Sequence, residues 1–234
     1  MTSSRTAPIA EIFVSDQGEG LYCGQRQIFI RFAGCNLNCS YCDEPAARKA
    51  DAARRMTLRQ ILKIVDSLRA SDHPEAVSLT GGEPLLFPAF LNHLIPALKR
   101  RGLQAHLETN GTLPQAYAKL KTKPAVVAAD IKLPSATKKQ FWNEHLRFLK
   151  LCRGNVFVKT VLDSRATSAE VERVIATVAQ ADKHIPLFWQ PCTPSKKEVR
   201  PPSPAFVKKA LRLARAKLSA VRVLRQMHVV WGVK

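Results

Sequence analysis

The sequence predicts an α/β fold built on parallel strands, and three observations lead to it. Short apolar segments that suit strands alternate along the 234 residues with amphipathic segments that suit helices. Several of the strand-like segments are apolar throughout, as in a parallel sheet covered on both faces. No internal repeat divides the chain, and the Pro-rich segment 190–204 is typical of a surface loop rather than a linker. We therefore expect a single domain over residues 1–234, with either an open sheet or a barrel.

Alternating strands and helices account for most of the chain. Thr57 and Thr167 suit helix N-caps, and Glu170 completes a capping box with Thr167. Pro96 lies inside the second helix, and Gly102 follows it. The expected strands are residues 27–32, 76–80, 104–108, 125–130, 155–162, 186–190 and 221–224. The expected helices are residues 57–68, 90–101, 137–151, 167–181 and a last one that opens at Ser203-Pro204.

Polar residues follow the expected strands at their carboxyl ends. In both parallel architectures these ends meet at one edge, where active sites form. We therefore expect one site at this edge, and the cysteines described next follow the first long strand. The strand-end segments are Gly81-Gly82-Glu83-Pro84, Glu108-Thr109-Asn110-Gly111, Asp130-Ile131-Lys132, Gln190-Pro191 and Gln226-Met227-His228.

Three cysteines in the loop 34–43 have the spacing Cys-x3-Cys-x2-Cys, at Cys35, Cys39 and Cys42. A structural zinc site takes four protein ligands, and no His precedes His73. Thiolates usually bind one iron each in a cubane iron–sulfur cluster, so three thiolates would leave the fourth iron open for chemistry. A zinc knuckle or three incidental thiols are the simpler alternatives.

Composition indicates a cytoplasmic protein. No apolar run is long enough to cross a membrane, and residues 1–10 lack the apolar core of a signal peptide. The six cysteines are then reduced thiols or metal ligands rather than disulfides. We expect Cys23, Cys152 and Cys192, outside the cysteine loop, to be ordinary core or loop residues.

The net charge of +19 favours anionic partners. Its basic clusters are scattered and lack interleaved aromatic residues, so a solvated cationic surface is favoured over a nucleic-acid site. An acidic electron-donor protein is the partner to consider next. The clusters are residues 99–101, 119–123, 138–139, 196–197 and 208–217.

The cysteine loop, with Tyr41 before its last cysteine, resembles the signature of the radical S-adenosylmethionine (SAM) superfamily. The Gly81-Gly82-Glu83 segment resembles the one that binds the SAM amino group there; glycine permits a close approach, and a carboxylate suits an ammonium group. The resemblance implies a partial (βα) barrel of about six parallel strands. It also implies a 4Fe-4S cluster on Cys35, Cys39 and Cys42, and a SAM-derived radical that abstracts hydrogen from the substrate. The implied SAM contacts are Tyr41, Gly81, Gly82, Glu83, Thr109, Asn110, Asp130 and Lys132.

Two flanking segments narrow the resemblance. Gln17-Gly18-Glu19-Gly20 and the tail 225–234, with Gln226-Met227-His228, resemble the 7-carboxy-7-deazaguanine synthase family. This family contracts the ring of 6-carboxy-5,6,7,8-tetrahydropterin with loss of ammonia, in 7-deazapurine (queuosine-type) biosynthesis, with SAM and Mg²⁺. A carboxylate suits the amidine edge of a pterin, and Arg31 suits its carboxylate. The implied pterin contacts are Gln17, Glu19, Arg31, Gln190 and His228.

Several of these residues have plainer roles open to them. Arg31 could be a structural ion-pair partner, Gln17 and Glu19 could organise a turn, and His228 could be a core histidine. One residue departs from the family pattern, because Glu44 follows Asp43 where the family has Thr at its magnesium site. A carboxylate is a good ligand for a hard cation. Either Glu44 binds magnesium in place of the Thr, or the substrate differs.

Two rival classes remain open, and some partners are implied. A glycyl-radical-enzyme activating enzyme acting on a protein partner would explain the cysteines but not the segment 17–20 or His228. A zinc-binding nucleic-acid module would explain the charge. The family resemblance implies a reducing donor such as flavodoxin or ferredoxin and a homodimer, and we expect neither a membrane nor a nucleic-acid partner.

Overall fold

The computed structural model describes residues 5–50, 53–74, 76–152, 154–194 and 199–233. The strands are β1 Thr6–Asp16, β2 Arg26–Phe32, β3 Arg54–Thr57, β4 Ala76–Gly81, β5 Gln104–Thr109, β6 Val126–Asp130, β7 Val156–Leu162, β8 Leu187–Pro191 and β9 Val221–Val223. The helices are α1 Leu58–Asp72, α2 Pro88–Lys99, α3 Pro114–Ala118, α4 Pro134–Thr137, α5 Trp142–Leu151, α6 Ser168–Asp182, α7 Pro204–Arg215 and α8 Met227–Trp231. Short 3₁₀ turns cover Gly20–Tyr22, Ala46–Arg48 and Pro84–Leu86.

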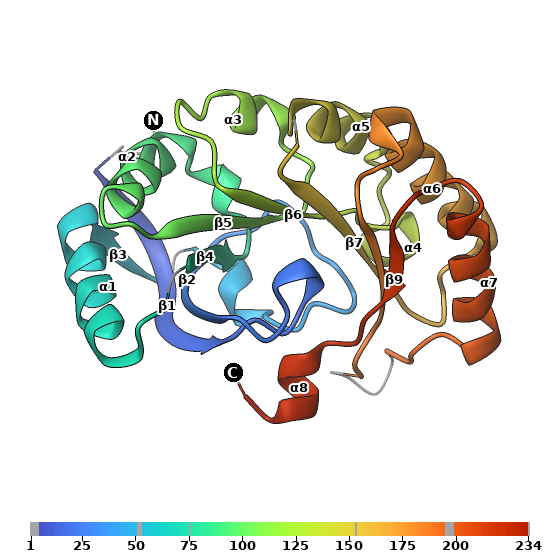
Figure 1. Cartoon of the computed structure of the whole chain (residues 1–234), viewed down its shortest axis with the longest axis horizontal. Coiled ribbons are helices and arrows are strands. Elements are labelled where there is room, and N and C mark those ends of the chain that lie inside the picture. Colours follow the sequence, from blue (N-terminus) through green and yellow to red (C-terminus); the bar gives the residue numbers. More distant parts are fainter. Residues whose placement is uncertain (1–4, 51–52, 75, 153, 195–198, 234) are drawn as a thin grey trace.

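The strands form one sheet of nine, in the order β3-β1-β2-β4-β5-β6-β7-β8-β9. From β2 to β9 every neighbouring pair is parallel, whereas β1 pairs antiparallel with both β2 and β3. The helices arc around the outside of the curved sheet (Figure 1), and the two edge strands, β3 and β9, do not pair with each other. The sheet is therefore a partial barrel, as the family resemblance implied, with seven parallel strands rather than about six.

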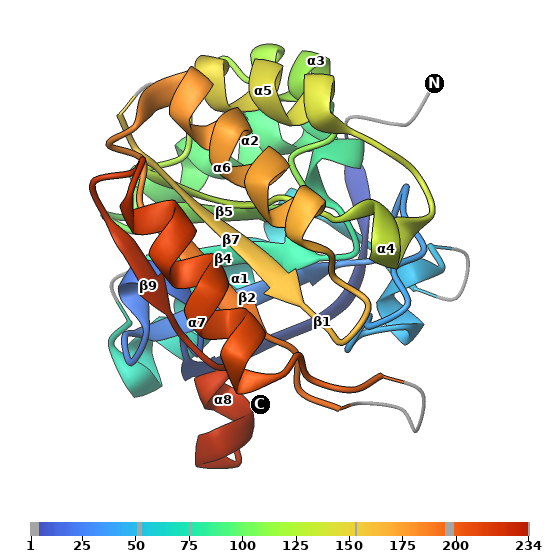
Figure 2. The same ribbon diagram turned by 90° about the vertical axis from the view of Figure 1, so that its right-hand side faces the viewer.

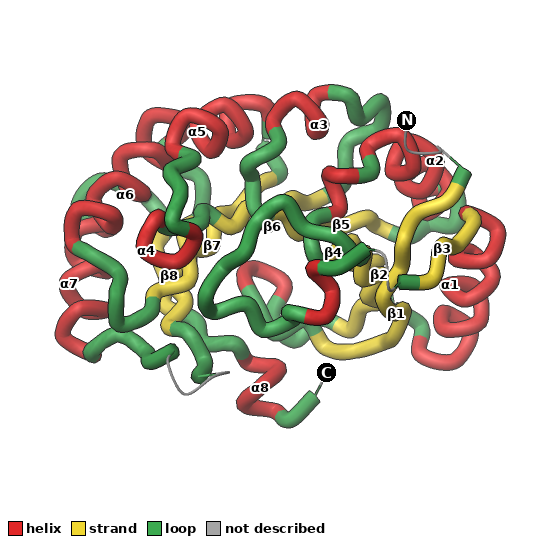
Figure 3. The backbone as a smooth tube through the Cα atoms, turned by 180° about the vertical axis from the view of Figure 1, so that it is seen from behind, coloured by secondary structure: helices red, strands yellow, loops and turns green. Residues whose placement is uncertain are grey.

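Helix caps confirm where two of the long helices begin. Thr57 accepts a hydrogen bond from the backbone of Gln60 and forms a capping box at the start of α1. Thr167 and Glu170 form the predicted capping box of α6. These helices pack their apolar faces on the outer side of the sheet, which leaves the strand ends and their loops to build the inner side. Seen from behind, the loops cross the hollow side of the arc (Figure 3).

Three features differ from the expectations. Strands β1 and β3 were not predicted, because β1 carries alternating polar residues and β3 is a short Arg-containing edge strand. The helix expected over residues 137–151 begins only at Trp142, as α5, because residue 137 ends the separate short helix α4 and Lys138 takes a left-handed conformation with φ of 60°. The short helices α3 and α8 were also not predicted. Residues 195–198 of the expected loop 190–204, with the basic pair 196–197, lie outside the described residues.

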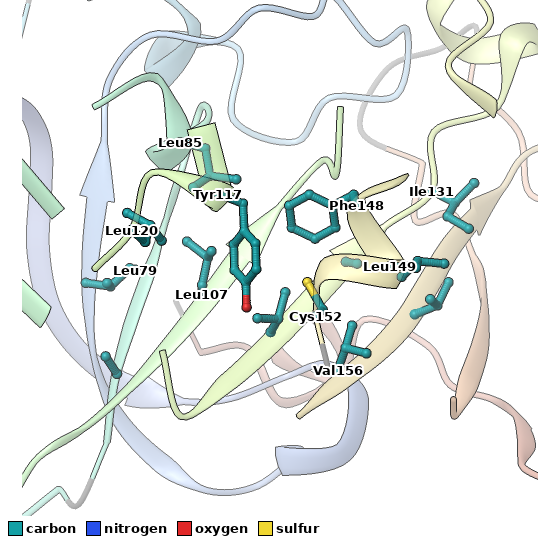
Figure 4. Packing of buried hydrophobic residues seen from close by; sticks show 14 of the residues in the cluster. Leu79, Leu85, Leu107, Tyr117, Leu120, Ile131, Phe148, Leu149, Cys152 and Val156 are labelled. Carbon is teal, nitrogen blue, oxygen red and sulfur yellow. The ribbon is translucent and has the colours of Figure 1, made fainter. Parts of the chain in front are cut away.

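The hydrophobic core lies between the helices and the outer face of the sheet. Tyr117 and Phe148 pack ring to ring with centroids 5.0 Å apart, and Leu107 of β5 lies beside them (Figure 4). Cys152 is buried in the same cluster, which confirms its role as an ordinary core residue. Among the described residues, no helix is both long and apolar enough to span a membrane.

Candidate functional site

A pocket opens where the parallel strands end, on the inner side of the barrel. Its wall combines the cysteine loop, the ends of β4 to β8, the turn after β1 and the C-terminal tail. Figure 2 shows the cysteine loop (light blue) at the end of the barrel beside α4. The pocket therefore lies at the edge of the sheet that the strand-end rule predicted. All of the predicted site residues except Glu83 line this pocket. They are Gln17, Glu19, Arg31, Cys35, Cys39, Tyr41, Cys42, Glu44, Gly81, Gly82, Thr109, Asn110, Asp130, Lys132, Gln190 and His228.

The cysteine loop rests directly on the Gly-Gly segment. Gly34 accepts a backbone hydrogen bond of 2.8 Å from Glu83, and Gly82 donates one of 2.9 Å to Phe32. A Cβ atom on Gly82 would lie 2.1 Å from the carbonyl oxygen of Gly34. Only glycine therefore allows the two segments this contact. The predicted cluster ligands and the predicted SAM segment are thus held together by their own backbones.

The three thiols share one wall of the pocket and are only partly exposed. Burial raises the pKa of each thiol, that of Cys39 to about 11. The backbone amide of Leu37 donates to the Cys35 sulfur at 3.4 Å, which favours its thiolate form. Among the described residues no three His, Cys, Asp or Glu side chains converge on a single-ion site. Thiols spread around a wall suit a cluster in which each binds its own iron.

Two buried polar atoms beside the thiols have no hydrogen-bond partner among the described residues. They are the Tyr41 hydroxyl and Oδ1 of Asp130, and both residues line the pocket. Such atoms are costly when unpaired, so they mark places where a polar ligand fits. The other oxygen of Asp130 accepts from Nζ of Lys132 at 2.7 Å, and this ammonium also lies 5.3 Å from the Tyr41 ring. The predicted SAM contacts thus include open hydrogen-bonding capacity.

Glu83 lies behind the pocket wall rather than on it, with no exposed surface. Its carboxylate accepts from the Thr109 hydroxyl at 2.8 Å and from the backbone amides of Asn110 at 2.8 Å and Leu85 at 3.0 Å. Burial raises the pKa of Glu83 to about 7 against these bonds and the charge of Lys132. Its contact with SAM stays a prediction. What the structure shows is that Glu83 fixes Thr109 and Asn110, which do line the pocket.

An ion pair that is largely but not fully buried, with side chains 12% and 13% exposed, forms the other end of the pocket. Lys159 of β7 bonds to one oxygen of Glu19, and the side chain of Gln190 donates to the other at 2.7 Å. Gln226 of the tail approaches the same oxygen at 3.4 Å. Burial raises the pKa of Glu19, but Lys159 and the amide of Gln190 outweigh it and lower the pKa to about 2. Glu19 is therefore ionised at every physiological pH.

A second carboxylate, Glu108 of β5, fixes the neighbouring residues. It accepts from Ser78 at 2.7 Å, Thr80 at 2.9 Å and the side-chain amide of Gln17 at 2.8 Å. The carbonyl oxygen of the same Gln17 side chain accepts from the backbone amide of Glu19 at 3.0 Å. Gln17 thus orients the turn that presents Glu19, as the plainer reading of this residue proposed, while it also lines the pocket.

Arg31 of β2 links the cysteine loop to β1. Its guanidinium bonds to Glu11 of β1 at 2.8 Å and to Glu44 of the cysteine loop at 3.3 Å, and it lies 5.6 Å from the Phe13 ring. Arg31 is thus a structural ion-pair partner as well as a pocket residue. Glu44 is 39% exposed and faces the pocket, so its predicted metal role and its ion pair involve the same carboxylate.

The C-terminal tail closes the pocket against the turn after β1. The amide of Met227 donates to the Gly18 carbonyl at 3.0 Å, and a Cβ atom on Gly18 would lie 2.5 Å from the backbone nitrogen of His228. His228 is thereby held in the pocket wall rather than in the core. The side-chain amide of Gln226 also donates to the carboxylate of Asp43 at 3.0 Å, so the tail reaches the cysteine loop.

Sequence reasoning assigned no site role to Lys159, Glu108 or Gln226. Glu108 and Gln226 stood in the strand-end segments, and their position was the available signal. The site role of Lys159 was harder to predict, because this residue lies within an apolar strand instead of after it. A lone ammonium in such a run needs a buried partner, and that requirement was the signal in the sequence. Cys192, expected to be ordinary, is buried but lines the pocket and packs against Tyr41.

Comparisons with known proteins agree with this geometry. The chain matches the radical SAM superfamily over residues 29–186. It is 33% identical to the 7-carboxy-7-deazaguanine synthase of Methanothermobacter thermautotrophicus, over 97% of this chain and 98% of that protein. It is 32% identical to the enzyme of the same name from Geobacter sulfurreducens, over 97% of each chain. The solved structure of QueE from Escherichia coli has a TM-score of 0.64 at 20% identity, covering 94% of this chain and 93% of that one, which shows the shared fold.

Proposed function

This chain belongs to the radical SAM superfamily and, within it, to the 7-carboxy-7-deazaguanine synthase family, and we propose that it contracts 6-carboxy-5,6,7,8-tetrahydropterin to 7-carboxy-7-deazaguanine with loss of ammonia. One observation carries the proposal. A single pocket holds the three thiols and the Gly-Gly segment at one end and an ionised, buried Glu19 at the other. A cofactor end and a pterin end thus face the same space.

The cofactor end would hold a 4Fe-4S cluster on Cys35, Cys39 and Cys42. Bound together, the cluster and SAM supply the abstraction of a hydrogen atom from the substrate. The chain's own part would be to position SAM: Gly81 and Gly82 line the pocket, and their strand-end carbonyls would hold its ammonium group. The side chains that would surround the rest of SAM are Tyr41, Thr109, Asn110, Asp130 and Lys132.

The pterin end would hold the substrate by charge and shape. Glu19, ionised and fixed by Lys159 and Gln190, accepts from the amidine edge of the pterin; the 3.4 Å contact with Gln226 is the weakest of its bonds and the first to be replaced. Arg31 faces the substrate carboxylate, and Gln17 and His228 close the sides. Lys159 pairs with Glu19 and, at 3.7 Å, with Asp130, so its role is to keep these carboxylates in place.

Magnesium is part of the proposal, with Glu44 as a direct or water-mediated ligand. Arg31 already pairs with Glu44. A bound cation would take the Glu44 carboxylate as a ligand, and the Arg31 guanidinium would then face the substrate carboxylate. The test is turnover titrated with magnesium. Wild type should depend on magnesium, and Glu44→Ala should need much more of it. Metal-independent wild-type turnover would refute the role of Glu44.

Further expectations belong to the same proposal. A product that feeds queuosine-type biosynthesis, a cytoplasmic location, a homodimer and a flavodoxin or ferredoxin donor all follow from the family. The rival function, activation of a glycyl-radical enzyme, gains no support, because the curated relatives carry the synthase name over nearly their whole length.

The deciding experiment is an anaerobic reaction of the iron-reconstituted protein with 6-carboxy-5,6,7,8-tetrahydropterin, SAM and dithionite, followed by mass spectrometry. The expected result is a product of the mass of 7-carboxy-7-deazaguanine and one ammonia per product. SAM cleavage without any change in the pterin would show that the superfamily is right and the substrate is wrong.

A further inference from the structure

Two arginines contact the cysteine loop, and one of them, Arg48, also lines the pocket. The guanidinium of Arg48 bonds to the side chain of Asn38, between the first two cysteines. The guanidinium of Arg165, in the loop before α6, bonds to the hydroxyl of Ser40, between the last two cysteines. Asn38 is exposed and Ser40 is partly exposed, so this face of the loop is open to solvent. The loop thus presents positive charge within one residue of Cys39.

More positive charge lies beside the same loop. The backbone amide of Ser40 donates to Ala136 of α4 at 3.1 Å, which fixes this helix against the loop. Lys138 and Lys139 follow α4 directly and are exposed. The left-handed conformation of Lys138 ends the helix there, so both lysines stay next to the loop instead of continuing along a helix. We call Arg48, Arg165, Lys138 and Lys139 the basic collar.

Acidic residues offset only part of the charge of the collar. Asp163 is 2% exposed, accepts from Nε of Arg165 at 3.0 Å and so offsets the charge of that arginine. Asp43, which is exposed, and Glu44 line the pocket, where they bond to Gln226 and Arg31. Among the residues that the structure describes, Arg48, Lys138 and Lys139 form no ion pair with a carboxylate, so the collar keeps a net positive charge. In the described part of the chain, none of the large exposed apolar side chains belongs to the collar segments.

We propose that the basic collar is the docking surface for an acidic one-electron carrier protein. This rests on the proposed function, in which the cluster must be reduced from outside. The carrier's reduced cofactor gives up one electron, and the centre held by the cysteine loop accepts that electron. Docking on the collar places the carrier against Ser40, the residue next to Cys39, whereas the pocket on the other side of the loop stays free for substrate.

Charge complementarity selects this kind of partner. Charged rims steer encounter and act mainly through the association rate, in a salt-dependent way. A short-lived electron-transfer encounter needs only a small contact surface, and the collar is small. A single-stranded nucleic acid would need exposed aromatic side chains for stacking beside the charge, and Trp231, the exposed large aromatic side chain in the described residues, lies on α8, outside the collar.

The experiment compares two double charge reversals in the iron-reconstituted protein. Lys138→Glu with Lys139→Glu changes the collar. Lys99→Glu with Arg100→Glu is the matched control, because both residues are exposed at the end of α2 that leads to the amino end of β5, on the opposite side of the sheet. The probe is a purified bacterial flavodoxin. Its dissociation constant is measured by flavin fluorescence at low and high salt, and SAM cleavage is driven either by reduced flavodoxin or by dithionite.

The collar variant should bind flavodoxin at least tenfold more weakly than wild type at low salt, about 1.4 kcal/mol, and high salt should remove the difference. Flavodoxin-driven cleavage should fall in parallel, while dithionite-driven cleavage should not change. Equal dissociation constants in the collar variant and wild type would overturn the proposal, and so would an equal loss in the control. Failure of the dithionite reaction in wild type would instead overturn the proposed function, and the dissociation constants would still decide the docking surface.

Discussion

The two ends of the pocket differ in how completely the protein finishes them. At the Glu19 end, the carboxylates of Glu19 and Glu108 are held by hydrogen bonds and an ion pair within the chain. At the cysteine end, partly buried thiols have raised pKa values, and polar atoms of Tyr41 and Asp130 have no partner among the described residues. Under the proposed function, the fold alone preorganises the end that would recognise the substrate, whereas the cofactors would complete the reactive end.

The sharpest contrast between the ends concerns iron. Cys39→Ser should lose the cluster and all turnover, because a hydroxyl is a poor iron ligand, while Cys23→Ser should keep both. Iron and sulfide analysis after anaerobic reconstitution measures this. Cys192→Ala is the stricter control, because Cys192 also lines the pocket. A loss of iron in Cys192→Ala equal to that in Cys39→Ser would contradict the assignment of three ligands.

At the pterin end the largest expected effect is on stability. Lys159→Met leaves the buried charge of Glu19 without its partner, which costs about 3–5 kcal/mol. Urea unfolding of the apoprotein measures the free energy of unfolding. Lys150→Met, which removes an exposed lysine of α5, should have almost no effect. Adding Glu19→Gln to Lys159→Met should recover much of the loss, and no recovery would show that the two residues are not coupled.

The same ion pair predicts a pH dependence. The pKa of Glu19 is about 2 in the folded protein and near 4.5 in the unfolded chain. Its stabilisation is therefore complete above pH 4.5 and is lost as the pH falls from there toward 2. The difference in unfolding free energy between wild type and Glu19→Gln should shrink over this range, by up to about 3 kcal/mol. A constant difference between pH 6 and pH 3 would show that the pKa of Glu19 is not lowered.

Arg31 lines the pocket and pairs with Glu44 of the cysteine loop, and the effect expected from its substitution is smaller. Arg31→Ala should raise the apparent substrate constant at least tenfold, about 1.4 kcal/mol, without changing SAM cleavage in the absence of substrate. Arg31→Lys keeps the charge but not the two-point contact, so its apparent substrate constant should lie between those of wild type and Arg31→Ala. Steady-state kinetics and SAM cleavage assays separate the effects. Unchanged kinetics in both single variants, Arg31→Ala and Glu19→Ala, would contradict the proposal that these residues bind the pterin.

The sequence predicted the parallel sheet well because its strands are apolar and its helices have clear caps, as at Thr57 and Thr167. It predicted most of the site because the polar residues follow strands, and parallel strand ends meet in space. It did not predict β1 and β3, whose antiparallel pairing depends on distant segments, or Lys159, whose partner Glu19 lies 140 residues away. The sequence also did not predict that Glu83 lies behind the pocket wall, because the same Gly-Gly-Glu segment is compatible with a carboxylate that faces the pocket and with one that is buried behind it.

Amide hydrogen–deuterium exchange of the apoprotein and the reconstituted protein tests the contrast between the two ends most directly. The amides of Glu19 and of β8, which contains Gln190, should be equally protected in both forms, because their hydrogen bonds need no cofactor. Within the cysteine loop, the amides of Asn36, Asn38, Cys39 and Tyr41 should gain protection only on reconstitution, because in the described part of the chain they donate no hydrogen bond, unlike those of Leu37, Ser40 and Cys42. Equal gains at both ends, or a cysteine loop already protected in the apoprotein, would contradict the claim that the protein builds one end of the pocket and the cofactors complete the other.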